Sequence, residues 1–348
     1  MGSTNPARRV LIIGSGYRVK NSFLPALKLL DSDVEVVGVH SRNIANARAA
    51  GEPFGVDAVE NLSSLRPGDV DAVLVSVTPT SNLAVLRATA HLAPGAALVM
   101  DTPAAVRWGD LRQLALYRRW RTVRVAEDFM NLPQFRLIGK VIESGAIGDV
   151  VRIRLESMGY RYHALALLRS WLGFPLVRSS HCRWSRKGAV DIVYRFPGGV
   201  TGEVIEPFTG ADGPFEVVGT RASITGHSMG HADSGAGGGR LERIEDGAGL
   251  SGFRVVGLGT ETTTTVPSLI PLRAMGLEDN SEFNLLRVDA LRQIIVSLWS
   301  PDPLNSAYRL QDAMADGLVS VTSRALPWWP TPRAGNRNMV DLAESVLK

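Results

Sequence analysis

Over residues 1–125 the chain alternates short apolar runs with segments in which apolar residues recur at helical spacing. Most residues in each run are apolar, as is typical of a strand whose two faces are both covered. Parallel strands need long crossovers, which are usually helices. The pattern therefore predicts a parallel α/β domain over residues 1–125. The predicted strands are Arg9–Ile13, Val34–Val39, Ala72–Val77, Ala97–Met100 and Thr122–Ala126.

Beyond residue 125 the pattern changes to strand-like segments separated by glycine turns. This favours an α+β domain over residues 126–348, built on one open, largely antiparallel sheet. We expect residues 226–259 to be its least regular part, with a flexible loop at Gly235–Gly239. A last helix is expected at Met339–Leu347, where it would be able to pack back on the first domain.

The composition excludes several classes of protein. The 38 basic and 34 acidic residues leave a net charge of +4, and no long run of like charges suggests a nucleic-acid partner. No apolar stretch approaches the roughly 20 residues that span a bilayer. Cys182 is the single cysteine, and His227 and His231 have no third ligand nearby, so we expect no metal site. A cytoplasmic protein with a small-molecule substrate is the expectation.

The sharpest motif follows the first predicted strand and reads Gly14-Ser15-Gly16-Tyr17-Arg18. A glycine at position 14 allows a tight turn, and Gly16 lets the backbone approach a pyrophosphate. The helix that follows would present its N-terminal N–H groups to that anion. Val19 replaces the third glycine of the usual fingerprint. We expect a Rossmann dinucleotide site here, although a plain turn between strand and helix remains the alternative.

The end of the second predicted strand usually decides which nicotinamide dinucleotide is bound. An acidic residue there holds the ribose hydroxyls, whereas this chain has Ser41 and Arg42 and no acid. Arg42 could pair with a 2′-phosphate, and Ser41 could donate a hydrogen bond. We therefore favour NADP(H) over NAD(H), the alternative being that Arg42 is only a solvated loop residue.

Several segments together resemble the Gfo/Idh/MocA oxidoreductases. The most specific is Val141–Val150 (VIESGAIGDV), and Asp101-Thr102-Pro103 stands where the family usually has Glu-Lys-Pro. The other matching segments, in chain order, are Phe23–Leu27, Asp71–Val73, Thr78–Thr80, Ala126-Glu127 and Phe215–Thr220.

The resemblance implies a Rossmann domain followed by a sheet domain, with the nicotinamide between them. It adds Thr78, Pro79 and Asp101 to the predicted cofactor contacts. It also implies a homodimer or homotetramer formed through the sheet. The usual reaction of the family is hydride transfer between nicotinamide and a sugar-like alcohol or ketone.

This chain departs from the family pattern at two catalytic positions. Thr102 replaces the lysine, and Ala166 stands where an aspartate often follows the histidine at position 163. His163 then remains the obvious proton donor, because an imidazole titrates near neutral pH.

Five further residues complete the predicted site. Two tyrosines flank His163, and both hydroxyls could also donate a proton. The predicted substrate contacts follow from position alone. The predicted catalytic residues are His163, Tyr160 and Tyr162, and the predicted substrate-binding residues are Glu127, Asn131 and Thr102.

Arg169 is not among these predicted site residues. For this arginine, a surface or interdomain ion pair is favoured over a role in substrate binding.

The missing lysine leaves two functions open. Biliverdin reductases and thiazolinyl imine reductases also lack it, and they reduce conjugated C=C or C=N groups. We therefore expect an NAD(P)H-dependent reductase of a C=N, conjugated C=C or C=O group. The alternative is a non-redox member of the family, either a dinucleotide-binding regulator or a cyclase- or lyase-type enzyme.

Overall fold

The computed structural model describes residues 6–184, 190–210, 213–230 and 238–325. These residues form two compact units, one of residues 6–128 and 271–314 and the other of residues 129–270 and 315–325. The first boundary between the two units falls after Asp128, close to the predicted domain boundary at 125/126. Residues 271–314, which the sequence pattern placed in the second domain, belong to the first unit. The predicted helix at 339–347, His231, and residues 235–237 of the predicted loop lie outside the described residues.

The first unit contains a five-stranded sheet of order β2-β1-β3-β4-β5, and every neighbouring pair is parallel. All four residues of β3 are buried, as are four of the five in β4. The predicted Rossmann-type sheet is confirmed. The strands are β1 (Arg8–Ile13), β2 (Val34–His40), β3 (Ala72–Val75), β4 (Ala97–Asp101) and β5 (Thr122–Ala126).

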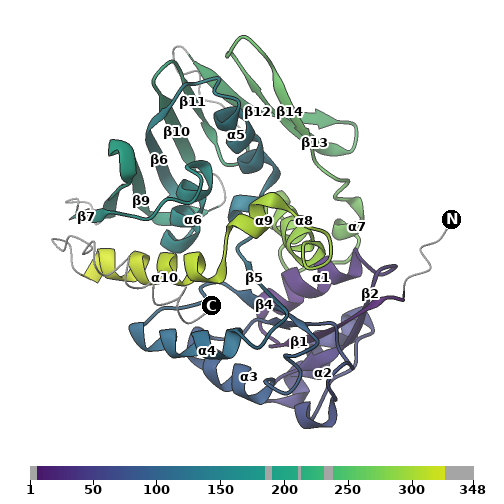
Figure 1. The fold of residues 1–348 in the computed structure, drawn as a ribbon. Helices are drawn as coiled ribbons and strands as arrows, with labels where there is room; N and C mark the ends of the chain where they lie inside the picture. The colour runs from purple at the N-terminus through teal and green to yellow at the C-terminus, as the bar shows by residue number, and fades with distance from the viewer. Residues whose placement is uncertain (1–5, 185–189, 211–212, 231–237, 326–348) are drawn as a thin grey trace. The chain divides into compact units, whose positions relative to one another are not determined.

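Helices cover both faces of this sheet. Figure 1 shows α1 and α8 on one face, and α3 and α4 on the other. Helix α8 packs against α1 and β5, which explains why residues 271–314 join the first unit. The α-helices of this unit are α1 (Leu24–Lys28), α2 (Ile44–Gly51), α3 (Asn82–Ala88), α4 (Leu114–Tyr117), α7 (Ile270–Arg273, from the last residue of the second unit), α8 (Glu282–Val296) and α9 (Pro303–Ala307).

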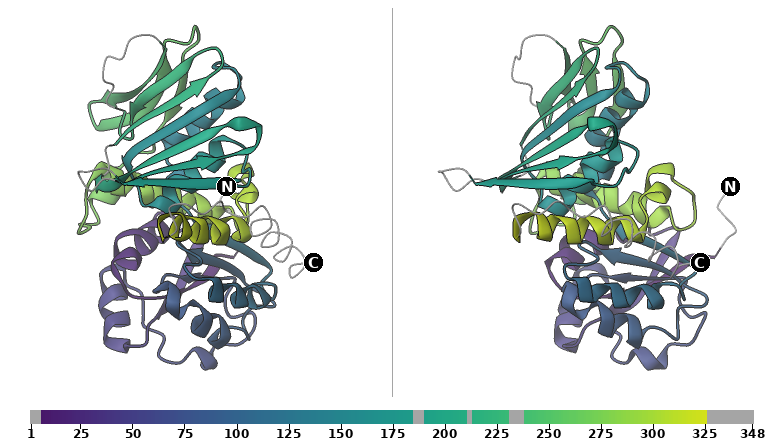
Figure 2. Two further views of the ribbon diagram at one scale, coloured as in Figure 1. Left: turned by 90° about the vertical axis from the view of Figure 1, so that its left-hand side faces the viewer. Right: turned by 60° about the vertical axis from the view of Figure 1, so that its left-hand side comes forward.

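The second unit contains a nine-stranded, strongly twisted sheet of order β14-β13-β12-β11-β10-β6-β9-β8-β7 (Figure 2). The pairs β11–β12 and β6–β9 are parallel and the others antiparallel, so the predicted largely antiparallel sheet is confirmed. The strands are β6 (Val150–Met158), β7 (Ser179–Trp184), β8 (Val190–Arg195), β9 (Thr201–Gly210), β10 (Pro214–Gly219), β11 (Ser223–His227), β12 (Gly239–Asp246), β13 (Gly249–Val256) and β14 (Thr262–Thr265).

The prediction of irregular structure over residues 226–259 was wrong for much of that segment. It contains the antiparallel hairpin of β12 and β13. Leu241 of β12 is buried, while its neighbours Arg240 and Glu242 are only half-buried. A strand with one apolar face and many charges and glycines resembles a loop in composition, and only its alternation marks it as a strand.

Three helices complete the second unit. Helix α5 packs against β13 and β14, and α6 packs against β9. Arg169 of α6 forms an ion pair with Asp316 of α10, its Nη1 lying 2.7 Å from the carboxylate oxygen. Both side chains are buried within this unit, so the expected surface or interdomain pair was wrong. The helices are α5 (Pro133–Glu143), α6 (Arg161–Trp171) and α10 (Leu310–Ala325), the last of which begins in the first unit.

None of the helices in the described ranges is both long and apolar enough to cross a membrane.

Candidate functional site: a dinucleotide-sized cavity

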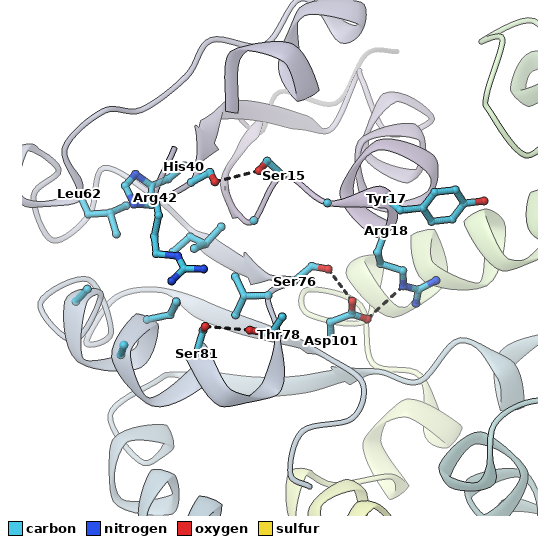
Figure 3. A pocket seen from close by; sticks show the side chains of 18 residues that line it. Ser15, Tyr17, Arg18, His40, Arg42, Leu62, Ser76, Thr78, Ser81 and Asp101 are labelled. Carbon is cyan, nitrogen blue, oxygen red and sulfur yellow. Dashed lines mark hydrogen bonds and ion pairs between the residues drawn. The ribbon is translucent and has the colours of Figure 1, made fainter. Parts of the chain in front are cut away.

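A cavity of about 610 Å³ lies in the first unit, at the carboxyl ends of β1, β2, β3 and β4 (Figure 3). Open α/β sheets bind ligands at this edge, where the strand order reverses. The structure brings together every predicted cofactor-binding residue except Pro79, which begins a short 3₁₀ turn beside the cavity. The lining residues that were predicted are Gly14, Ser15, Gly16, Tyr17, Arg18, Ser41, Arg42, Thr78 and Asp101.

The turn after β1 requires glycine at position 14. Gly14 has a φ of +127°, and a Cβ atom there would lie 2.0 Å from the carbonyl oxygen of Ser76. A Cβ on Gly16, by contrast, would meet nothing within 4 Å. The first glycine therefore lets β1 and β3 approach each other, and the second leaves the backbone open to a ligand.

Serine and arginine side chains line the β2 end of the cavity. The hydroxyl of Ser15 donates a hydrogen bond to that of Ser41 at 3.0 Å, which links the turn after β1 to the end of β2. Arg42 is exposed, and among the described residues it has no hydrogen-bond or ion-pair partner. Its guanidinium projects over the cavity in Figure 3 and is free to pair with an anion there.

A different arginine lines the β4 end. Arg18 donates from Nε to Asp101 at 3.2 Å and from Nη1 to Asp128 at 2.7 Å. Asp101 also accepts a hydrogen bond of 2.7 Å from the Ser76 hydroxyl. Burial lowers the pKa of Arg18, but the charges of Asp128 and Asp101 outweigh burial and raise it above the ordinary value. This arginine is therefore permanently charged.

Sequence reasoning missed Ser76 and Asp128. Ser76 directly follows β3, so the rule that ligands bind at carboxyl ends of strands could have identified it. Asp128 is fully buried and also pairs with Arg287, whose Nε lies 3.0 Å from the same carboxylate oxygen. A carboxylate placed just after an apolar strand was the available signal for it.

The replacement of the third fingerprint glycine has a visible counterpart in the backbone. Val19 is fully buried and begins a π-helical turn, Val19–Phe23, that runs directly into α1. Its Cγ2 atom lies 3.4 Å from an ideal Cβ on Gly14. Wide turns of this type are rare and often occur at functional sites.

The predicted catalytic residues lie together in the second unit. His163, in the first turn of α6, is only 6% exposed. Its ring centroid lies 4.3 Å from that of Tyr162 and 5.8 Å from that of Phe129. Tyr160 precedes the helix, is largely exposed, and stacks on Tyr162 at 6.0 Å. The imidazole is thus part of an aromatic cluster.

The predicted substrate-binding residues do not line the described cavity. Thr102 follows β4 and is half-buried. Glu127 follows β5 and is fully buried. Asn131 is buried in a 3₁₀ turn of the second unit, Phe129–Asn131. Their assignment to substrate binding stays a prediction.

Comparison with known proteins agrees with this fold. Residues 8–129 match the GFO_IDH_MocA model, described as an oxidoreductase family with an NAD-binding Rossmann fold. Residues 8–129 of this chain are thus similar to the Rossmann domain of that family. A dTDP-3,4-didehydro-2,6-dideoxy-alpha-D-glucose 3-reductase of Streptomyces violaceoruber is 31% identical over 152 residues. That match covers 41% of this chain and 42% of the relative, so it spans about two fifths of each protein.

Similar solved structures extend over both units. GenD2 of gentamicin A biosynthesis, in complex with NAD, has a TM-score of 0.64 at 19% identity, covering 93% of this chain and 96% of that one. KijD10, a 3-ketoreductase from Actinomadura kijaniata in complex with NADP and TDP-benzene, has a TM-score of 0.61 at 16% identity, covering 92% and 98%. At these identities the likeness establishes the fold alone.

Proposed function

We propose that this chain is an NAD(P)H-dependent reductase of a C=O, C=N or conjugated C=C group in a small organic molecule. The observation that carries the proposal is the cavity at the carboxyl ends of β1–β4, with the Gly14 turn and Arg42 at its wall. Its volume falls within the range of cofactor sites. The partial match to a keto-sugar reductase makes a sugar carbonyl the first substrate to test.

The residues at the cavity fit a dinucleotide. The open backbone at Gly16 and the start of the helix that follows would hold the pyrophosphate. Arg42 is exposed after β2 and has no partner in the ranges that the structure describes, so it would be able to hold a 2′-phosphate, and we propose a preference for NADP(H). A bound reduced nicotinamide would supply the hydride. The chain must then provide a proton, and we propose that His163 donates it.

The proposal predicts net oxidation of the cofactor. Incubating the protein with NADPH and a panel of keto sugars, other ketones and imines should consume NADPH in proportion to reduced product. Tight binding without consumption in any substrate class would instead favour the non-redox alternative, which the threonine at position 102 keeps open. Transient oxidation followed by recovery would indicate a lyase- or epimerase-type reaction.

Replacing Arg42 by serine should change cofactor preference. A charge-assisted hydrogen bond contributes about 1.5–3 kcal/mol, so the NADPH dissociation constant should rise about 10- to 100-fold. The NADH constant should stay within about twofold, because NADH lacks the phosphate. Fluorescence titration with both cofactors measures this. Arg48→Ser is the matched control, since Arg48 is exposed on the nearby α2 outside the cavity. Equal losses for both cofactors would contradict the assignment.

Replacing His163 by glutamine should slow turnover while leaving cofactor binding unchanged. Removing a general acid costs at least about 10²-fold in rate. Steady-state rates and NADPH titrations on the same preparation separate the two effects. His91→Gln is a suitable control, because His91 is a half-buried histidine of the first unit that lies outside the cavity. An unchanged rate in His163→Gln would remove His163 from the mechanism.

A further inference from the structure

The cavity is lined by two arginines, one at each end. Arg42 follows β2, whereas Arg18 reaches the end of β4 (Figure 3). No lysine is among the described residues that line it. In folds of this type the residue after β2 contacts the adenosine ribose, and the pyrophosphate lies at the glycine turn. The reacting ring of a dinucleotide would therefore lie toward β3 and β4, beside Ser76, Asp101 and Arg18.

The side chain of Arg18 is held in a fixed position. Besides its bonds to the two aspartates, Nη1 donates to Ser22 Oγ at 3.4 Å and Nη2 donates to the Ala126 carbonyl at 3.4 Å. A guanidinium has five N–H donors, so within the described part of the chain these four hydrogen bonds leave one donor on Nη2 for a ligand. The side chain is 17% exposed, and Arg18 is among the residues that line the cavity.

The carboxylate partners of Arg18 have further contacts of their own. Asp128 pairs with both Arg18 and Arg287, and Asp101 is fixed by the Ser76 hydroxyl and by its hydrogen bond from the Thr102 backbone N–H. A third buried carboxylate, that of Glu127, has an oxygen within 4.8 Å of an Asp128 oxygen. A cation held by such contacts need not reorganise when charge develops nearby, which is the condition for effective electrostatic stabilisation.

We propose that Arg18 is the fixed positive charge of the reaction site, in place of a lysine at position 102. This inference rests on the proposed reductase function. In the reduction of a ketone, the hydride pair forms a new C–H bond at the carbonyl carbon, and the C=O π pair moves onto the oxygen. Arg18 stabilises that negative charge. Because a guanidinium keeps its proton, a separate acid must protonate the oxygen, and the cofactor leaves oxidised.

Single-turnover reduction with saturating NADPH tests the role of this charge. Arg18→Met should lower the hydride-transfer rate about 10²-fold, as removal of an oxyanion donor does elsewhere. Adding Thr102→Lys to Arg18→Met should restore part of the rate, since it returns a cation to the neighbouring position. Arg18→Lys should keep part of the rate but lose it in alkaline solution, as its ammonium deprotonates.

Arg287→Met is the matched control. It removes the other arginine that pairs with Asp128, but Arg287 does not line the cavity. Its single-turnover rate should stay within about threefold of the parent. Melting temperatures of all variants show whether any has lost its fold, and a loss of rate shared equally by Arg18→Met and Arg287→Met would overturn the proposal in favour of a structural role.

A second measurement needs no substrate. Sulfite adds through its sulfur lone pair to C4 of a bound oxidised nicotinamide, giving an adduct with near-ultraviolet absorbance. A cation near C4 should favour this adduct, so its equilibrium constant should fall about tenfold or more in Arg18→Met and stay unchanged in Arg287→Met. If the parent forms this charge-sensitive adduct but reduces no substrate, the reductase function fails while the assignment of Arg18 stands. If the parent reduces substrate and Arg18→Met changes neither rate nor adduct, the assignment of Arg18 is wrong.

Discussion

Replacing Gly14 by alanine is expected to abolish cofactor binding and to lower the melting temperature of the protein. The new methyl group would lie 2.0 Å from the Ser76 carbonyl oxygen, which is backbone and cannot rotate away. The φ of +127° is also one that side-chain-bearing residues rarely adopt. The turn must therefore move, and both the separation of β1 from β3 and the approach to the pyrophosphate change with it.

Gly16→Ala is expected to weaken cofactor binding while leaving the stability of the fold unchanged. A Cβ at position 16 meets nothing within 4 Å, so the melting temperature should stay close to that of the parent. Its methyl group would project into the open space of the cavity, and NADPH should bind more weakly. Circular dichroism and calorimetric titration measure the two properties. If Gly14→Ala binds NADPH and melts as the parent does, the turn at Gly14 does not hold the cofactor.

The second large effect is expected at Arg169. Its Nε donates to the Pro175 carbonyl at 2.8 Å, and Nη1 pairs with Asp316 at 2.7 Å. The side chains of the pair are 1% and 3% exposed. Arg169→Met leaves the carboxylate of Asp316 buried without this arginine, and breaking a buried pair in this way costs about 3–5 kcal/mol in the free energy of unfolding. Urea denaturation followed by tryptophan fluorescence measures the loss.

Two further variants show whether burial of the ion pair causes the large loss of stability expected for Arg169→Met. Arg152→Met breaks the pair with Glu216, whose side chains are 39% and 35% exposed, and should cost no more than about 1 kcal/mol. Adding Asp316→Leu to Arg169→Met removes the second buried charge and should recover part of the stability. Equal losses for Arg152→Met and Arg169→Met would show that burial does not set the strength of this pair.

The parts of the fold that could be predicted are those encoded locally. A continuous apolar run such as Val10–Ile13 of β1, stopped by Gly14, specifies a buried strand and a tight turn without reference to distant residues. The alternating pattern of β8 likewise specifies a half-buried strand from local sequence alone. Hairpin β12–β13 was missed because its many charged residues and glycines give it the composition of a loop, although one face of each strand is buried. That α8 belongs to the first unit could not be predicted, because an amphipathic pattern does not indicate which sheet the helix covers.

In the candidate site, too, the locally encoded features could be predicted and the contacts between distant residues could not. Gly14, Gly16 and Arg42 were predictable because each lies at a fixed offset from a strand end. The contacts of Arg18 were not, since they join residues 18, 101, 128 and 287, which only the folded sheet brings together. The motif marked Arg18 only as part of the predicted dinucleotide site, whereas in the structure its guanidinium pairs with Asp101 and Asp128.

A calorimetric titration of the full chain with NADPH and with NADH shows directly whether the protein binds a nicotinamide dinucleotide. We expect one binding site per chain, tighter binding of NADPH, and loss of binding in Gly14→Ala but retention in Arg287→Met. Absence of binding by either cofactor to a folded protein would contradict this expectation.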